Sequence, residues 1–228
     1  MFITFKNLLK SNIYIGNNFQ NIHFNNYKFI YKIKYNNCIL NFTLIALYLY
    51  KLYIYIYNIF LLNQKILFIN NNNNLMLNFI IKICNLTNNF YIIKWIPGLL
   101  TNWSIFKKKI IIYIWLYKLL KNKYLINIIS KKCLIKLNII YNKLNNKFKG
   151  IKYMLNIPKY IFLTNFNNDL ILNEILKLKL ILISFINLSL DSNIINIKIL
   201  GNYNNYKSLK LIYQIIYTSI IHSKIKNM

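Results

Sequence analysis

The sequence contains no arginine and almost no acidic residues. All 30 basic residues are lysine, the acids are Asp169, Glu174 and Asp191, and the formal net charge is +27. Four glycines and two prolines exclude collagen-like proteins and glycine–serine linkers. A hydrophobic content of 57% excludes a disordered tail, because such tails lack the apolar residues to form a core. The 228 residues are therefore expected to fold around one main core.

Cysteine and histidine are too few and too widely separated to form a site. Cys38, Cys84 and Cys133 fit neither a disulfide framework nor a zinc knuckle, which predicts three buried thiols. His23 and His222 lack partners at the spacing of a metal site or a catalytic triad. We therefore expect no metal and no cofactor.

The acidic residues do not form a catalytic pair either. Asp169 and Glu174 are five positions apart, which places them about 140° apart around a helix. They are expected to be a helix N-terminal acid and a surface acid, respectively. The chain has no glycine-rich nucleotide loop, and an enzyme needs positioned titratable groups. We therefore expect no enzymatic activity and no small-molecule substrate.

Six residue types make up most of the chain: Ile (48), Asn (40), Leu (35), Lys (30), Tyr (20) and Phe (15). Most of these types have codons rich in A and T, so the composition is typical of a strongly AT-biased genome, such as a reduced organelle genome. Asparagine is therefore a weaker turn signal than usual. A tryptophan, glycine, proline or acidic residue that persists against this bias is expected to hold its place for a physical reason.

The positive charge indicates an anionic partner, either lipid or nucleic acid. The membrane alternative rests on residues 39–62, which carry one charge and are long enough for a spanning helix of about 20 residues. However, Lys51 lies at the centre of the segment, where an ionised group costs about 2.5–3.5 kcal/mol. Tyrosines also fill its middle, although tyrosine prefers the membrane interface. An organelle-encoded integral membrane subunit stays the alternative interpretation.

The distribution of lysine favours nucleic acid. Residues 103–153 contain 13 lysines and no acid. Neutralised phosphates release counterions, so such a stretch binds nucleic acid strongly and with steep salt dependence. Lysine without arginine favours phosphate contacts over bidentate base recognition. The same charge is also compatible with a solvated helix face or with a free nucleic-acid-binding module.

Strand and helix patterns alternate along the chain. Buried-strand patterns cover 65–69, 90–93, 160–163, 180–185 and 194–199, and helical patterns cover 39–62, 75–86, 105–148, 168–178 and 203–222. The asparagines at 70–74 are predicted to form a turn. Such alternation predicts an α/β fold of the flavodoxin or Rossmann type, with a parallel sheet covered by helices on both faces.

The stretch 105–148 is apolar and basic at helical spacings, and it is expected to break near residues 122–123 or 130. We interpret it as a helical hairpin. The predicted organisation is therefore a core domain of residues 1–104 and 150–228, into which a lysine-rich hairpin of residues 105–149 is inserted.

One segment concentrates the residues that the composition avoids. Residues 94–104, Lys-Trp-Ile-Pro-Gly-Leu-Leu-Thr-Asn-Trp-Ser, contain two tryptophans, a proline and a glycine. The pattern predicts a strand end, a tight Pro-Gly turn, and a helix that begins between residues 101 and 104. Trp103 is expected either to anchor the core or to stack on RNA or a protein partner.

This segment resembles the small-subunit ribosomal protein S-two family, which carries a Lys/Arg-Trp-Leu-Gly-Gly-x-Leu-Thr-Asn stretch, continued as Trp-Ser in plastid members. Residues 150–154 (Gly-Ile-Lys-Tyr-Met) and 157–158 (Ile-Pro) are similar to a second segment of the family. The resemblance extends over about residues 8–222, with further similarity at Ile15-Gly16-Asn17, Glu174, Leu178, 180–185, Gly201-Asn202 and 207–212.

Several residues depart from the pattern of the family. Pro97 replaces a glycine and Lys159 stands where an aspartate is expected. Acids and histidines of the family are replaced at Tyr14, Asn17, Asn204 and Asn205. A change from acid to amide removes charge but keeps hydrogen bonding, which suits a more electropositive surface.

The resemblance implies a structural protein of the small ribosomal subunit, bound to small-subunit rRNA and to neighbouring ribosomal proteins and without enzymatic activity. The plastid-type segments and the composition point to an organelle-encoded protein of a plastid ribosome, similar to that of an apicoplast, with a mitochondrion as the alternative. The rRNA-binding patch is expected on the hairpin and its base: Lys94, Asn102, Trp103, Lys107, Lys108, Lys109, Lys131, Lys132, Lys143, Lys147, Lys149 and Lys152.

Overall fold

A computed structural model describes residues 4–19, 22–70, 76–164 and 169–227. Its centre is a five-stranded sheet of β4 (Ile66–Ile69), β5 (Phe90–Ile92), β6 (Tyr160–Leu163), β7 (Ile181–Phe185) and β8 (Ile197–Ile199). All paired strands are parallel, in the order β5-β4-β6-β7-β8. This is the strand order of a flavodoxin-type doubly wound sheet. The predicted α/β class with a parallel sheet is confirmed.

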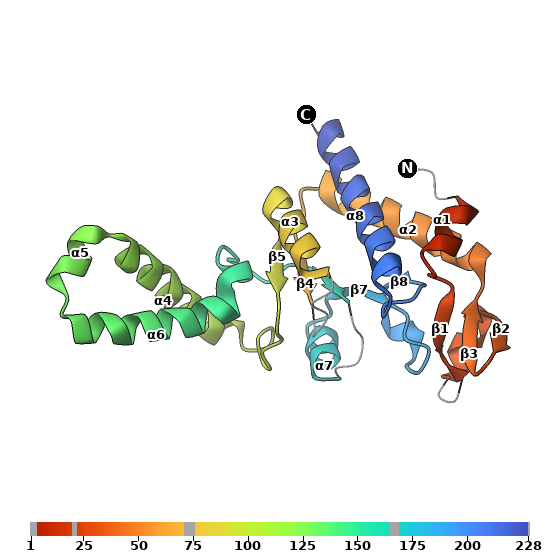
Figure 1. Cartoon of the computed structure of the whole chain (residues 1–228), viewed down its shortest axis with the longest axis horizontal. Helices are drawn as coiled ribbons and strands as arrows, with labels where there is room; N and C mark the ends of the chain where they lie inside the picture. The colour runs from red at the N-terminus through yellow and green to blue at the C-terminus, as the bar shows by residue number, and fades with distance from the viewer. Residues whose placement is uncertain (1–3, 20–21, 71–75, 165–168, 228) are drawn as a thin grey trace.

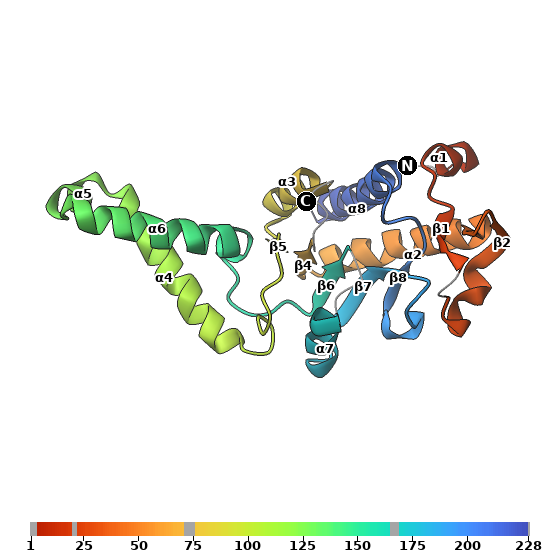
Figure 2. The same ribbon diagram turned by 60° about the horizontal axis from the view of Figure 1, so that its bottom comes forward.

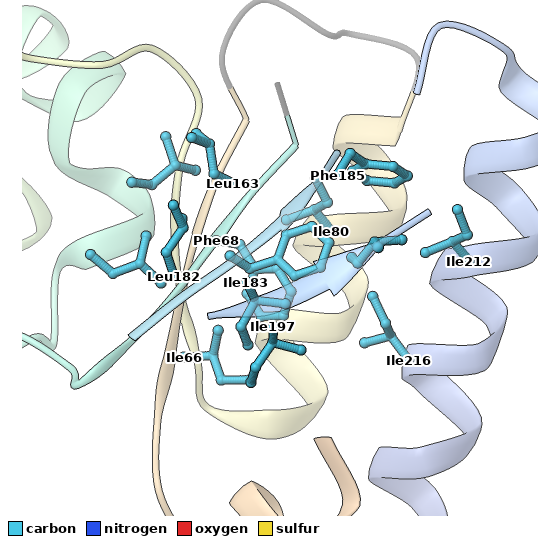
Figure 3. Packing of buried hydrophobic residues seen from close by; sticks show 14 of the residues in the cluster. Ile66, Phe68, Ile80, Leu163, Leu182, Ile183, Phe185, Ile197, Ile212 and Ile216 are labelled. Atoms are coloured by element: carbon cyan, nitrogen blue, oxygen red, sulfur yellow. The ribbon is translucent and has the colours of Figure 1, made fainter. Parts of the chain in front are cut away.

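The strands are short apolar runs because helices cover both faces of the sheet. α3 (Leu77–Thr87) and α8 (Tyr206–Lys226) lie on one face, and α7 (Asp169–Lys177) lies on the other (Figure 2). Phe185 lies on the α8 side with Ile212, whereas Leu163 and Leu182 lie on the opposite side of the sheet (Figure 3). This alternation follows the period of two of a strand, and the resulting burial of apolar surface is the main stabilising contribution.

α2 (Phe42–Leu61) is the one described helix that is long and apolar enough to cross a membrane. It packs against α8 and β8, and its buried residues Ile45, Leu49, Leu52 and Ile56 recur at helical spacing. Lys51 is exposed on the same helix. The segment 39–62 is therefore mainly a helix that covers the α/β core, although its first two residues belong to a strand.

The N-terminal part forms a second, antiparallel sheet that the sequence patterns do not predict. It consists of β1 (Ile15–Asn18), β3 (Asn37–Leu40) and β2 (Ile30–Lys34), in the order β1-β3-β2. α1 (Phe5–Lys10) precedes it, and a 3-10 helix (Phe24–Phe29) connects β1 to β2. This sheet is joined to the main domain by side-chain hydrogen bonds from Asn26 to the carbonyls of Leu188 (3.0 Å) and Leu190 (2.7 Å).

The helical hairpin projects from the β5 edge of the parallel sheet, at the end of the molecule opposite the antiparallel sheet (Figure 1). It consists of α4 (Trp103–Lys121), α5 (Lys123–Ile128) and α6 (Lys131–Phe148). The helix breaks at both predicted positions. Asn122 caps α5 by accepting a hydrogen bond from Tyr124 N (3.1 Å), and Ser130 is the N-cap residue of α6. The predicted hairpin is confirmed.

Other predictions differ from the structure in detail. β8 is shorter than the predicted 194–199, because a 3-10 helix (Ser192–Ile194) precedes it. Residues 71–74 of the predicted turn and the first residues of two predicted helices, 75 and 168, lie outside the described residues. Cys38 and Cys84 are buried, but Cys133 is exposed on α6. The prediction of three buried thiols is therefore wrong, because α6 belongs to the projecting hairpin and only Phe148 of this helix is buried.

Candidate nucleic-acid interface

The segment that connects β5 to the hairpin is a tight turn. Leu99 N donates a hydrogen bond to Ile96 O (3.1 Å), and Gly98 has a φ of +79°. These features define a type II turn, which needs glycine or asparagine at its third residue. Pro97 occupies the second position, where a φ near −65° is required. The proline that replaces a glycine of the family therefore suits this turn.

The carboxylate of Glu174 holds the turn in place. It accepts hydrogen bonds from the backbone N–H groups of Gly98 (2.8 Å), Leu100 (3.0 Å) and Thr101 (3.3 Å). Glu174 is only 8% exposed. The prediction of a surface acid is wrong, because helical spacing does not reveal a loop that closes over the residue. Asp169 does lie exposed in the first turn of α7, as predicted.

The other end of the hairpin is also fixed to the sheet. A Cβ atom added to Gly150 would lie 2.1 Å from the carbonyl oxygen of Tyr91 in β5, so the backbone approaches this strand as closely as glycine permits. At the first end, where α4 begins, Trp103 is half-buried and packs against the core, and its Nε1–H donates a hydrogen bond to Leu155 O (3.4 Å). Both ends of the hairpin are thus anchored on rigid elements.

The inside of the hairpin is formed by aromatic rings. Tyr113 stacks on Tyr141 with 5.7 Å between the ring centroids, and its hydroxyl donates a hydrogen bond to Asn145 Oδ1 (2.8 Å). Burial and the neighbouring tyrosines raise the pKa of Tyr113 to about 12. Phe106 meets Phe148 edge to face at 6.2 Å. These contacts leave the lysines on the outside of the hairpin.

The structure places nearly all predicted patch residues on the surface. The side chains of Lys94, Asn102, Lys107, Lys108, Lys109, Lys131, Lys132, Lys143, Lys147 and Lys149 are exposed. Lys152 is half-buried, and its Nζ lies 3.5 Å from the ring centroid of Tyr117 on α4. Because residues 103–153 contain no acid, these ammonium groups have no carboxylate within the hairpin.

A cavity of about 530 Å³ lies beside the base of the hairpin, between α3 and residues 149–153. Its lining includes Lys149, Lys152, Tyr153 and Asn85. Two ammonium groups next to a tyrosine ring and an amide have the chemistry to hold a phosphate and an unpaired base.

The hairpin also exposes apolar side chains that sequence reasoning did not identify. Trp115 on α4 is 57% exposed, and Ile111, Ile112, Ile128 and Ile135 are exposed as well. A large exposed apolar surface marks an interaction site. The signal that could have identified Trp115 is the tryptophan itself, because tryptophan is rare in a chain whose composition is typical of an AT-biased genome.

The described residues contain no group of three or more His, Cys, Asp or Glu side chains that lies together. What they do bring together at the hairpin is ammonium groups, exposed rings and exposed isoleucines. This arrangement can neutralise a polyanion and contact a folded partner at the same time.

Comparisons with known proteins agree with this description. The family model described as Ribosomal protein S2 matches residues 8–223. The small ribosomal subunit protein uS2c of Toxoplasma gondii is 37% identical to the chain, over 96% of both sequences. The small ribosomal subunit protein uS2 of Carsonella ruddii is 30% identical, over 93% of this chain and 97% of the relative. The uS2 protein of Borreliella burgdorferi is 30% identical over 57% of this chain and half of its own length. The chain therefore belongs to the ribosomal protein S2 family.

Proposed function

We propose that this protein is a structural component of the small subunit of a plastid ribosome, where it binds small-subunit rRNA and neighbouring ribosomal proteins and catalyses no reaction. Membership of the ribosomal protein S2 family supports the ribosomal role. The relative named uS2c supports a plastid rather than a mitochondrion. The observation that carries the proposal is a projecting hairpin with many lysines, no acid and exposed apolar side chains.

The proposed mechanism assigns different tasks to two domains. Residues 1–104 and 150–228 form a rigid core domain, and residues 105–149 form a hairpin domain that extends to the RNA. The outward lysines neutralise phosphates of the rRNA backbone and release counterions. The Glu174 contacts and the close approach at Gly150 support this assignment, because they fix the direction in which the hairpin projects.

The proposal is tested by assembly into ribosomes. We expect the protein to co-migrate with the small subunit in a sucrose gradient of a detergent-treated lysate at moderate salt. Replacing five hairpin lysines by glutamine (Lys107, Lys108, Lys109, Lys131 and Lys132) is expected to cause its release at lower salt. Each lost phosphate contact reduces the slope of log affinity against log salt by about 1. Exposed lysines outside the patch (Lys207, Lys210, Lys226, Lys6 and Lys10) provide a control with the same change of charge.

Two outcomes would contradict the proposal. Recovery only in carbonate-resistant membrane pellets would favour the membrane alternative, which rests on α2 and receives no support from the comparisons. In the second outcome, the unmodified protein leaves the ribosome at low salt and is stable in isolation. That result would favour a free nucleic-acid-binding module.

A further inference from the structure

The turn between β2 and β3 holds a tyrosine in an unusual conformation. Lys34 pairs with Asn37, so Tyr35 and Asn36 form a two-residue hairpin turn. Their φ angles are +47° and +59°. Two successive positive φ angles are typical of a type I′ turn, for which asparagine and glycine are favoured. Asn36 suits this conformation, whereas a bulky side chain such as Tyr35 rarely adopts it.

The fold buries almost none of the tyrosine at this position. Tyr35 is 87% exposed, and Tyr31 in the adjoining strand is 68% exposed. β2 is an edge strand of the antiparallel sheet, and of its five residues only Ile30 is not exposed. Strained residues that the fold does not require are typical of functional sites.

A lysine ammonium group lies near the ring of Tyr35 and another near the ring of Tyr31. Lys34 Nζ lies 5.2 Å from the ring centroid of Tyr35, and Lys32 Nζ lies 5.8 Å from that of Tyr31. No acidic residue occurs before Asp169 in the sequence. An exposed ring stacks on an unpaired base, and the ammonium group beside it neutralises the phosphate of the same nucleotide.

We propose that Tyr31, Lys32, Lys34 and Tyr35, here called the tyrosine ribbon, bind single-stranded RNA. The two rings stack on unpaired bases, and the two lysines contact the phosphates. This surface lies at the opposite end of the molecule from the lysine-rich hairpin (Figure 1). It binds bases in addition to phosphates, so it goes beyond the proposed function and rests on that function only for the origin of the RNA.

The strained turn provides a clean test. In the full-length protein, Tyr35→Gly removes the ring and also removes the strain of a bulky residue at positive φ. The free energy of unfolding is therefore expected to stay the same or to rise. The affinity for a fluorescent twelve-nucleotide oligouridylate is expected to fall about tenfold, because one base loses its stacking contact with an aromatic ring. Tyr50→Ala, which removes another exposed ring from α2, is the control and is expected to leave the affinity unchanged.

A second variant and a second substrate separate the outcomes. Tyr35→Asn also suits a positive φ, and it replaces Tyr35→Gly should the glycine variant unfold. The five-lysine hairpin variant is expected to bind double-stranded RNA more weakly, whereas Tyr35→Gly is expected to bind it as the wild type does. Failure of the proposed function and failure of the tyrosine ribbon therefore give different results. Wild-type affinity of Tyr35→Gly for oligouridylate would overturn the proposal. If Tyr35→Gly impairs incorporation into ribosomes but leaves the oligouridylate affinity unchanged, the proposal is also overturned. That result would favour a protein partner at this edge strand.

Discussion

The α/β core and the helical hairpin use the same few residue types in opposite ways. In the core, isoleucine, leucine and phenylalanine fill both faces of the sheet, and Phe162 is fully buried between Phe68 and Tyr213. On the hairpin, few side chains are buried, while isoleucines such as Ile111 and Ile135 face outward. Composition alone therefore does not distinguish a residue that stabilises the fold from one that meets a partner.

The two regions therefore have different requirements. The parallel sheet and the helices on it bury most of their apolar side chains against one another. The hairpin carries lysines that repel one another and apolar side chains that face water. Both properties favour binding of a partner that covers the hairpin. We expect substitutions in the core to change stability, and substitutions on the hairpin to change assembly.

The largest effect is expected in the core. Phe162→Ala should lower the free energy of unfolding by about 4 kcal/mol, because it removes a fully buried ring from a packed interior. Ile139→Ala on α6, where half of the side chain is exposed, should change it by less than about 0.5 kcal/mol. Denaturant unfolding of the two variants measures the contrast, and equal losses would refute the division into two regions.

A smaller loss is expected at the junction of the two regions. Glu174→Gln keeps one acceptor oxygen but loses the charge that receives three backbone N–H groups, so it should cost about 2 kcal/mol. Tryptic cleavage after Lys94 should become faster. Asp169→Asn, an exposed change on the same helix, is the control. Similar cleavage rates for both variants would contradict the role of Glu174 in holding the turn.

The turn itself should respond more weakly. Gly98→Ala places a Cβ atom at a φ of +79° and should cost about 1 kcal/mol. Gly98→Asn should cost less, because asparagine tolerates this region. Thermal unfolding ranks the two variants, and a more stable alanine variant would disprove the type II turn.

The smallest effect concerns thiol reactivity and leaves stability unchanged. In the free native protein, Cys133 should react with a maleimide, whereas Cys84 should react only after unfolding, because it is buried and burial raises the pKa of its thiol. Within the small subunit, Cys133 should be protected if a partner covers α6. Mass spectrometry of the peptides measures how much of each cysteine is labelled in the free protein and in the small subunit. Full labelling of Cys133 in the subunit would show that no partner covers this face of α6.

The parallel sheet was predictable because its strands are dense apolar runs between helical patterns, as at Ile66–Ile69 and Tyr160–Leu163. The antiparallel sheet was not. Its edge strand, Ile30–Lys34, alternates tyrosine, isoleucine and lysine and is mostly exposed. Its turn begins with a tyrosine instead of the glycine or asparagine that marks a hairpin. In a chain with 40 asparagines, turn signals also lose their contrast.

The lysine patch was predictable in outline because exposure follows from charge. The role of Glu174 was not, since its partners lie 73 to 76 positions away and are backbone groups without a sequence signature. Trp103 was predicted as an anchor or a stacking residue. It packs against the core, and whether it also contacts RNA stays a prediction, as does the role of each lysine.

The close approach of Gly150 to Tyr91 has a consequence for how this sequence can evolve. Every single-base substitution that changes the residue encoded by a glycine codon introduces a side chain or a stop signal. At this position, any such side chain would collide with a backbone carbonyl 2.1 Å away. Mutation towards A and T can convert aspartate to asparagine on the surface without such a collision. At Gly150, by contrast, we expect any replacement to disturb the contact between the base of the hairpin and β5.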